Sequence, residues 1–282
     1  MMKFSEIIRT IKTIIKNFRD IGKIQQTVIF SEIERLQKIY ARDGASLIPY
    51  GRKSYSQNDE DGIIEEIFRR IGHENKRFVE IGIGDGKENN TLALLLAGWK
   101  GLWIDMNAGS IKDVVKNWAG LIDSTTLTAI AFRVDAANID RIIADAGFRG
   151  EVDLLSIDID GNDAYIFEAI KCISPRCVVI EYNAKFGPTL DYCIPYSQDF
   201  EYDGTDAFGS SLKHLQNVFS RRGYSLVGCN LAGVNAFFVR SDLVTDKFIQ
   251  PYTAEVHYQP PRYHLSGYVS GHPSSFRVIS GI

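Results

Sequence analysis

Residues 77–86 read RFVEIGIGDG, a short apolar run that leads directly into three glycines spaced two residues apart. Aromatic and β-branched residues suit a buried strand, and Glu80 stands at its carboxyl end, where open α/β sheets bind their ligands. Gly82 and Gly84 allow the backbone to turn sharply and to approach a ligand closely. Residues 89–98 (NNTLALLLAG) then have the pattern of a helix. The stretch therefore predicts a strand, a ligand-binding turn and a helix.

A second strand is predicted at residues 101–105 (GLWID), and it ends in an acid about 20 residues after the glycines. A carboxylate at Asp105 is placed to accept hydrogen bonds from the two neighbouring hydroxyls of a ribose. Lys87 stands where the third glycine of the dinucleotide motif Gly-x-Gly-x-x-Gly belongs. The sequence thus predicts a nucleoside-containing cofactor, and an NAD(P)-dependent oxidoreductase of Rossmann type is one alternative.

The polar turn at residues 56–62 (SQNDEDG) precedes the helical pattern IIEEIFRRIG. Residues of these types commonly cap a helix, and capping is one interpretation. In the other, the turn lies beside the glycine loop and Ser56 or Gln57 contacts the cofactor.

Acidic and amide side chains gather at the ends of two further predicted strands. Asp158 and Asp160 are two residues apart and share a face of the fourth strand, while Glu181 and Asn183 end the fifth. Oxygen ligands of this kind suit Mg²⁺ or Ca²⁺, so the pattern predicts a site for a divalent cation. Alternatively, Asp160 or Asp163 caps the next helix and Asp158 binds backbone amides.

The predicted fold is α/β: a Rossmann-like, doubly wound, mostly parallel seven-stranded sheet. A third strand covers residues 127–134, and an antiparallel hairpin at residues 224–230 and 234–240 closes the sheet. We expect a helical N-terminal extension at residues 1–50, the cofactor-binding domain at 51–245, and an aromatic tail or lid at 246–282. The tail is either solvated or folded over the site or a partner subunit.

Apolar residues recur at three- and four-residue steps along residues 4–18, with lysines and arginines on the other side, as in an amphipathic helix. Gly22 is expected to end or bend this helix before a second helix at residues 28–40. The stripe favours packing on the domain or a homo-oligomer over binding to a membrane surface.

The composition of the chain argues against several other classes of protein. A net charge of -3 and a hydrophobic content of 45% give no case for a nucleic-acid partner. Four cysteines without metal-like spacing predict reduced thiols in the cytoplasm. No apolar run reaches the roughly 20 residues of a transmembrane helix, and Arg9, Lys12 and Lys16 interrupt any signal-peptide core.

With these residues in view, the chain resembles FkbM-type methyltransferases, within the class I S-adenosylmethionine-dependent superfamily, from about residue 56 to 240. The resemblance rests on the turn at 56–62, the strand and its glycine at 78–82, the segment LSIDIDG at 155–161, and EYN at 181–183. That family usually has Asp-x-Glu-Gly where this chain has Asp-Ile-Asp-Gly at 158–161.

The resemblance implies O-methylation of a hydroxyl on a sugar, a glycan precursor or a secondary metabolite, with S-adenosylmethionine as donor. It places Glu80 and Gly82 near the methionine end of the donor, and Asp135 and Ala136 beside the adenine. It also makes Asp158, Glu181 and Asn183 the candidate metal ligands, with Asp160 as a substitute.

For catalysis we expect the metal to orient the acceptor and act as a Lewis acid, with Asp160, His214 or His257 as the general base. A third interpretation is a non-catalytic nucleotide-binding assembly subunit, in which the N-terminal helix matters most. The acceptor is a small molecule or glycan that the residue types do not identify.

Overall fold

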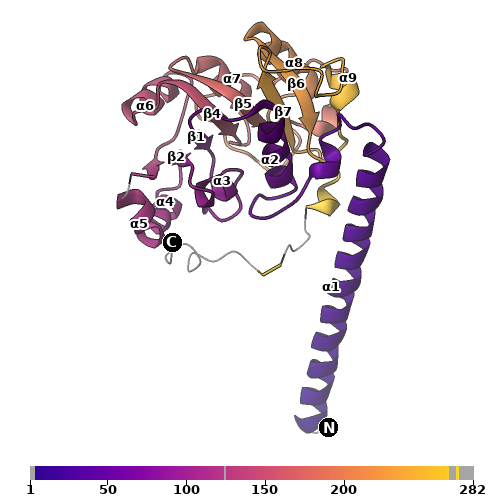
Figure 1. Ribbon diagram of the computed structural model, residues 1–282. Helices are drawn as coiled ribbons and strands as arrows, with labels where there is room; N and C mark the ends of the chain where they lie inside the picture. Colours follow the sequence, from indigo (N-terminus) through magenta and orange to yellow (C-terminus); the bar gives the residue numbers. More distant parts are fainter. Residues whose placement is uncertain (1–3, 124, 267–270, 273–282) are drawn as a thin grey trace.

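The computed structural model describes residues 4–123, 125–266 and 271–272 of the 282-residue chain. In this part, seven strands form one sheet with the order β3-β2-β1-β4-β5-β7-β6 (Figure 1). Strands β1 to β5 are parallel, and β7 runs antiparallel to both β5 and β6. The predicted fold class is confirmed, including the hairpin that closes the sheet.

The strands are β1 (Arg77–Ile81), β2 (Lys100–Asp105), β3 (Leu127–Ala131), β4 (Gly150–Ile157), β5 (Ile173–Glu181), β6 (Tyr224–Cys229) and β7 (Asn235–Arg240). The helices that connect or flank them are α2 (Glu60–Ile71), α3 (Leu92–Leu96), α4 (Ala108–Asn117), α5 (Ala119–Asp123), α6 (Ile139–Asp145), α7 (Asp163–Ala169), α8 (Leu212–Arg221) and α9 (Ala254–His257). Three short 3-10 helices complete the set: η1 (Ile48–Tyr50), η2 (Ala184–Phe186) and η3 (Tyr263–Leu265).

Helices cover both faces of the sheet, as its near-continuous apolar strands require. Phe78 and Trp103 pack on one face with side chains of α2, α3 and α4. Val79 and Leu102 pack on the other face with α6, α7 and α8. Because successive strand residues point to opposite faces, each central strand contributes to both cores.

The strand order reverses direction at β1, which lies between β2 and β4. In open α/β sheets, ligands bind at such a switch point, outside the carboxyl ends of the strands. The glycine loop leaves β1 at this place. Gly82 adopts a φ of +85°, and a Cβ atom there would lie 1.6 Å from the carbonyl oxygen of Asp158, so only glycine fits without a backbone shift.

The helix after the glycine loop is shorter than predicted. α3 spans Leu92–Leu96, whereas the apolar pattern predicted residues 89–98. The carboxylate of Glu80 explains its late start, since it accepts hydrogen bonds from the backbone N–H groups of Asn90 (2.8 Å) and Thr91 (3.2 Å).

The N-terminal extension is one helix, α1 (Phe4–Tyr40), and the predicted end or bend at Gly22 is wrong. A Cβ atom built on Gly22 would meet nothing within 4 Å, so no close contact requires glycine at this position. Glycine costs the helix about 1 kcal/mol through its low helix propensity, and the helix tolerates this cost. Only the last part of α1 packs on the body, through Ile29 and Leu36. The rest projects away from it (Figure 1).

The described part of the tail is folded onto the domain, so a solvated tail is wrong for this segment. Phe248, Ala254 and Leu265 are buried. Tyr182 donates its hydroxyl to the carbonyl of Gln259 at 2.7 Å, and Tyr258 donates to the carbonyl of Ala184 at 2.6 Å. Residues 267–270 and 273–282 of the predicted tail lie outside the described residues.

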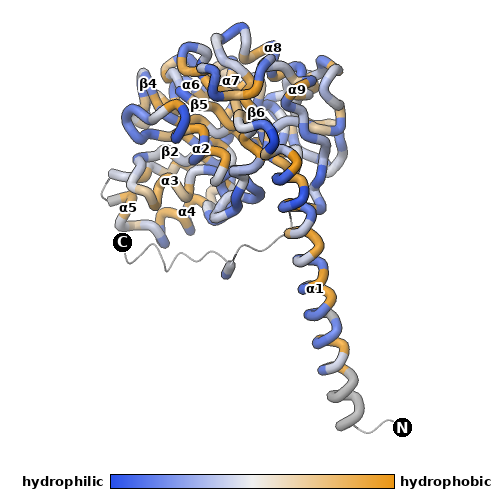
Figure 2. Tube along the Cα trace, turned by 45° about the vertical axis from the view of Figure 1, so that its right-hand side comes forward, coloured by the Kyte–Doolittle hydropathy of each residue, from blue (hydrophilic) through white to orange (hydrophobic). Residues whose placement is uncertain are grey.

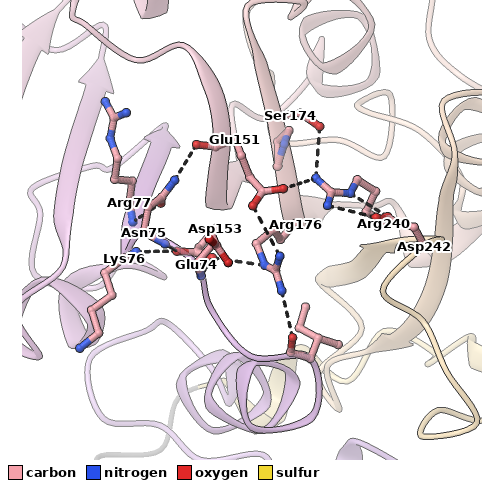
Figure 3. Close-up of polar contacts among 12 residues, drawn as sticks. Glu74, Asn75, Lys76, Arg77, Glu151, Asp153, Ser174, Arg176, Arg240 and Asp242 are labelled. Atoms are coloured by element: carbon pink, nitrogen blue, oxygen red, sulfur yellow. Dashed lines mark hydrogen bonds and ion pairs between the residues drawn. The ribbon is translucent and has the colours of Figure 1, made fainter.

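A network of polar contacts surrounds the start of β4, at the end of the sheet opposite the carboxyl ends of the parallel strands (Figure 3). The fully buried Asp153 accepts hydrogen bonds from the backbone N–H groups of Glu74, Asn75 and Lys76 at 2.6 to 2.9 Å. Arg176 lies 3.4 Å from the same carboxylate. These contacts join the start of β4 to the α2–β1 turn, which is a structural role.

None of the described helices combines the length and apolar character needed to cross a membrane. The four cysteines are free thiols.

Candidate active site

A cavity of about 1070 Å³ opens at the switch point between β1 and β4. Its floor is formed by the carboxyl ends of the parallel strands, and its outer wall by residues 198–208 with Tyr263 and Ser266 of the tail. Of the predicted site residues, six line it: Gln57, Gly82, Gly84, Asp105, Asp158 and Asp160, together with Glu181 from the predicted metal set.

The glycine loop and Asp105 meet as predicted. Gly84, at a φ of +57°, donates its backbone N–H to Oδ2 of Asp105 over 2.8 Å, and Asn107 donates to Oδ1 over 2.7 Å. A carboxylate offers about four lone-pair sites, so Asp105 retains capacity to accept hydrogen bonds from a ligand.

Two exposed apolar side chains that the sequence patterns did not reveal line the cavity near Asp105. Met106 follows β2 and is 69% exposed, and Phe132 follows β3 and is 41% exposed. Both line the cavity. Large apolar side chains left open at adjacent strand ends suit a flat aromatic ring. The usable signal in the sequence is their position directly after two strands that end beside the glycine loop.

The turn before α2 was expected either to cap the helix or to contact the cofactor through Ser56 or Gln57, and its residues differ in their surroundings. Ser56 is fully buried and does not line the cavity, because its hydroxyl donates to Oδ2 of Asp61 at 2.9 Å. Gln57 does line the cavity. Asp59 occupies the N-cap position of α2 without a side-chain capping bond. Gln57 therefore remains the candidate for ligand contact.

Glu80 is placed away from the cavity lining, contrary to the expected cofactor contact. Its buried carboxylate accepts from the side chain of Asn89 at 2.9 Å, from the two backbone amides before α3, and from the hydroxyl of Thr91. Burial raises the pKa of Glu80 to about 7 despite these donors. Its observed role is to hold the segment that follows the glycine loop.

Asp135 and Ala136 also do not line the cavity in the described chain. Oδ1 of Asp135 accepts the backbone N–H groups of Ala137 and Asn138, and Oδ2 accepts Nε2 of Gln198 at 2.9 Å. Asp135 thus acts on the site indirectly, by holding Gln198, which does line the cavity.

Three carboxylates converge on the other side of the glycine loop. Asp158, Asp160 and Glu181 each offer an oxygen, and these atoms all lie within 4.8 Å of one another. Oε2 of Glu181 is buried without a hydrogen-bond partner among the described residues. Strands β4 and β5 are parallel neighbours, which explains why their acidic ends meet here.

The electrostatics of this cluster favour a positive charge or a proton. Burial raises the pKa of Asp158 well above its usual value, and the carboxylates of Asp163 and Asp160 raise it further. Burial and the nearby Asp158 raise the pKa of Glu181 in the same way. Like charges this close resist joint ionisation.

Asp163 shapes the loop that carries Asp160. Its two carboxylate oxygens accept the backbone N–H groups of Ile159 and Gly161, each at 2.9 Å. Between them Asp160 adopts a φ of +60°, a left-handed conformation that is uncommon for a residue with a side chain. Asp163 therefore holds this loop and does not cap α7, whose N-cap residue is Asn162, while Asp158 and Asp160 line the cavity.

Asn183 is not among the converging groups. It is buried, its amide donates to the carbonyls of Asp206 (2.9 Å) and Phe208 (3.1 Å), and its oxygen accepts from the backbone of Lys185 at 3.2 Å. The side chain is committed to holding the loop, and Asp160 takes its place in the metal set.

The two candidate histidines lie outside the cavity lining. Nδ1 of His214 lies 2.8 Å from Oδ1 of Asp191 at the start of α8. His257 is buried with Nε2 3.1 Å from the carbonyl of Ile249, and burial lowers its pKa to about 4. Neither is positioned to act as the base.

Aromatic side chains form the outer wall, another feature that the sequence did not assign. They are Phe200, Tyr202, Phe208 and Tyr263. Phe200 sits so close to the carboxylate loop that a Cβ on Gly161 would lie 2.4 Å from its ring. Arg133 is the one cationic side chain among the described lining residues, and it donates to the carbonyl of Phe200 at 2.9 Å.

The residues present fit a divalent cation. Three carboxylates whose oxygens lie within 4.8 Å of one another, one of them buried with no partner among the described residues, form an oxygen donor set of the kind that hard cations prefer.

No protein-family model matches the sequence, and no curated protein matches it. Solved structures share the fold at low identity. An O-methyltransferase from Bacillus cereus in complex with SAH is 12% identical at a TM-score of 0.42, covering 75% of this chain and 89% of that one.

Two others are similar to the same degree. An S-adenosylmethionine-dependent methyltransferase from Clostridium acetobutylicum is 11% identical at a TM-score of 0.42, with 66% and 92% covered. The N-terminal domain of EvdMO1 with SAH bound is 14% identical at 0.42, with 73% and 94% covered. Identities this low concern the fold alone, and TM-scores below 0.5 carry no information about the reaction.

Proposed function

We propose that this protein is an S-adenosylmethionine-dependent O-methyltransferase that acts in the cytoplasm on a hydroxyl of a sugar, a glycan precursor or a secondary metabolite. One observation carries the proposal. A single cavity contains the glycine loop bonded to Asp105 and, across Gly82, the carboxylate cluster of Asp158, Asp160 and Glu181.

The donor occupies the side of the cavity formed by β1, β2 and β3. Asp105 accepts the ribose hydroxyls, and the exposed side chains of Met106 and Phe132 contact the adenine ring. S-adenosylmethionine supplies the methyl group on a sulfonium, which carries positive charge. Acidic lining residues favour such a ligand, and besides the cluster they include Asp85, Glu88, Asp105 and Glu201.

A dinucleotide fits this loop poorly. Dinucleotides place their diphosphate on free N–H groups at the start of the helix after the glycine loop. Here the amides of Asn90 and Thr91 are already bonded to the carboxylate of Glu80. These observations count against the oxidoreductase alternative.

The acceptor hydroxyl lies beside the carboxylate cluster. Methyl transfer needs its oxygen aligned with the sulfonium methyl and its proton removed. Asp158 or Asp160 accepts that proton, because both carboxylates line the cavity beside the glycine loop. A divalent cation held by Asp158, Asp160 and Glu181 would supply Lewis acidity to the hydroxyl.

The wall of Phe200, Tyr202 and Tyr263 supports an acceptor with an apolar face, such as a sugar ring. Lys185 is the cationic side chain after β5, but it pairs with Asp206 and does not line the cavity, so it offers no site for a phosphorylated acceptor. The acidic side chains of the described lining outnumber its one cation, Arg133, which counts against an anionic acceptor. Homo-oligomerisation through the N-terminal helix is part of the same proposal.

The thermal midpoint of the purified protein tests the proposal. Millimolar S-adenosylmethionine should raise it by binding the folded state, whereas NAD and NADP should not. A shift with NAD or NADP and none with S-adenosylmethionine would exclude the methyltransferase.

A further inference from the structure

Helix α1 carries two apolar stripes at different angular positions. The stripe near its C-terminus consists of Ile29, Ile33, Leu36 and Tyr40, at steps of three and four residues. It packs against η1, η3 and Leu231 of the same chain. Gln37 adds a hydrogen bond to the carbonyl of Gly51 at 2.8 Å. This stripe is filled by the chain's own body.

The other stripe is not filled by the described chain. Its large apolar side chains are between 47% and 65% exposed, and they are Ile11, Ile14, Ile15, Ile21, Ile24 and Val28. Figure 2 shows apolar and polar segments alternating along the part of α1 that projects beyond the body. Isolated exposed residues need no explanation, but a continuous row along a helix marks an interaction surface.

The spacing of this second stripe is that of a coiled coil. Ile11 and Ile14 recur seven residues later as Phe18 and Ile21, and again as Gln25 and Val28. A strict seven-residue repeat matches a left-handed supercoil, whereas a helix lying on a flat surface follows the 3.6-residue period. The repeat ends where Glu32 and Arg35 occupy the next two positions, and they pair at 2.7 Å.

Charges are placed as such a seam requires. Lys12, Lys16, Arg19, Asp20 and Lys23 all fall at positions facing away from the repeat, and Ile15 and Ile24 flank it. No like charges would therefore meet across a symmetric contact between copies. Gln25 is the single polar residue among the described core positions, and it can pair with its own counterpart only when the helices run parallel.

We propose that residues 11–28 of α1 form a parallel, three-stranded coiled coil with the same segment of two further copies of this chain. The second core position is β-branched throughout (Ile14, Ile21 and Val28), where two-stranded coils prefer leucine, and apolar residues flank the seam; both features favour three or more strands over two. The seam spans residues 11–28 and the body-packing stripe begins at Ile29, so the two contacts occupy successive lengths of α1 and the catalytic domains remain outside the coil. This inference extends the assembly part of the proposed function and is independent of methyl transfer.

The mass of the full-length protein in solution tests the inference. Sedimentation equilibrium should give three times the protomer mass of 31.7 kDa. The double variant Ile14→Lys with Ile21→Lys should fall threefold in mass to a monomer, because it buries charges in the seam. Lys16→Gln with Lys23→Gln is the matched control on the outer face and should stay trimeric.

Far-ultraviolet circular dichroism and S-adenosylmethionine binding check that the double variant keeps its fold. Loss of the trimer can therefore be distinguished from loss of donor binding. Gln25→Ile should resist dissociation on dilution, since it replaces the polar layer. A monomeric wild type, a dimer, or an unchanged mass in the double variant overturns the inference. Monomeric protein that co-sediments with phosphatidylserine vesicles overturns it in favour of a membrane surface.

Discussion

Gly82 and Asp158 touch through backbone atoms, since a Cβ atom on Gly82 would lie 1.6 Å from the carbonyl oxygen of Asp158. The backbone N–H of Asp158 also donates to the carbonyl of Ile81 at 3.0 Å. The proposed donor loop and the acidic cluster are therefore held in one rigid unit. Their relative position depends on this contact more than on any side chain.

Gly82→Ala should destabilise the fold and the donor site together. The substitution adds a clash with backbone to a φ of +85°, and we expect a loss of at least about 3 kcal/mol. Gly98→Ala is the matched control, because Gly98 has a φ of +80° with open space around it, and about 1 kcal/mol is expected there. Urea denaturation measures both, and equal losses would contradict the close contact.

Asp153→Asn should destabilise the protein without affecting ligand binding. The substitution removes a charge that is fully buried, bonded to three backbone amides and paired with Arg176 (Figure 3). We expect a loss of about 2–4 kcal/mol. Asp242→Asn, at an exposed partner of Arg240, should cost less than about 1 kcal/mol. Denaturant midpoints for the two variants should differ clearly, and a neutral Asp153→Asn would remove the structural role.

The acidic cluster should make the metal-free protein less stable as pH rises. A carboxyl whose pKa is higher in the folded chain stabilises the fold at low pH and loses that contribution as pH rises through the folded pKa. The pKa values of Asp158 and Glu181 are raised, and that of Asp163 is raised to about 6. Glu181→Gln should therefore raise the thermal midpoint in chelator, by more at pH 8 than at pH 5.

The comparison with wild type isolates the cluster, because His257 titrates equally in both proteins. Burial lowers the pKa of His257 to about 4, so it affects stability only on the acid side of neutrality. A difference in thermal midpoint between variant and wild type that stays constant from pH 5 to 8 would show that neighbouring carboxylates do not repel Glu181.

A divalent cation should bind the cluster and relieve this repulsion. Mn²⁺ titrated into the chelator-treated protein should give saturable binding followed by electron paramagnetic resonance. Asp158→Asn should weaken it by at least about tenfold, since it removes one of the three carboxylates. Asn183→Ala is the informative control, because the Asn183 amide bonds to the backbone carbonyls of Asp206 and Phe208 and not to the cluster. Equal weakening by both variants would place the ion elsewhere.

Much of this fold was predictable from local patterns. Glycines at 82 and 84 followed an apolar strand, Asp105 ended the next strand, and acids ended β4 and β5. The carboxyl ends of parallel strands meet at one edge, so Asp158 and Glu181 had to approach one another. The same reasoning predicted Asn183 as a metal ligand, which the structure does not support. A position at the end of a strand does not reveal which backbone groups the side chain binds.

Features that depend on tertiary contacts were not predictable. Glu80 stands at the expected strand end, yet burial and the segment at residues 89–91 turn it inward. Met106 and Phe132 resemble ordinary apolar residues until neighbouring strands leave them open. Gly22 signals a helix end by composition, but α1 continues because a single glycine costs less than a helix of this length gains.

Isothermal titration calorimetry of S-adenosylmethionine into the full-length protein tests the central claim most directly. We predict one binding site per protomer, weakened by at least about tenfold in Asp105→Ala, which loses a lining carboxylate bonded to Gly84. Asp135→Ala, four residues beyond the end of β3 and outside the cavity lining, should weaken binding much less. Absence of heat with S-adenosylmethionine, or equal effects of the two variants, would contradict the account.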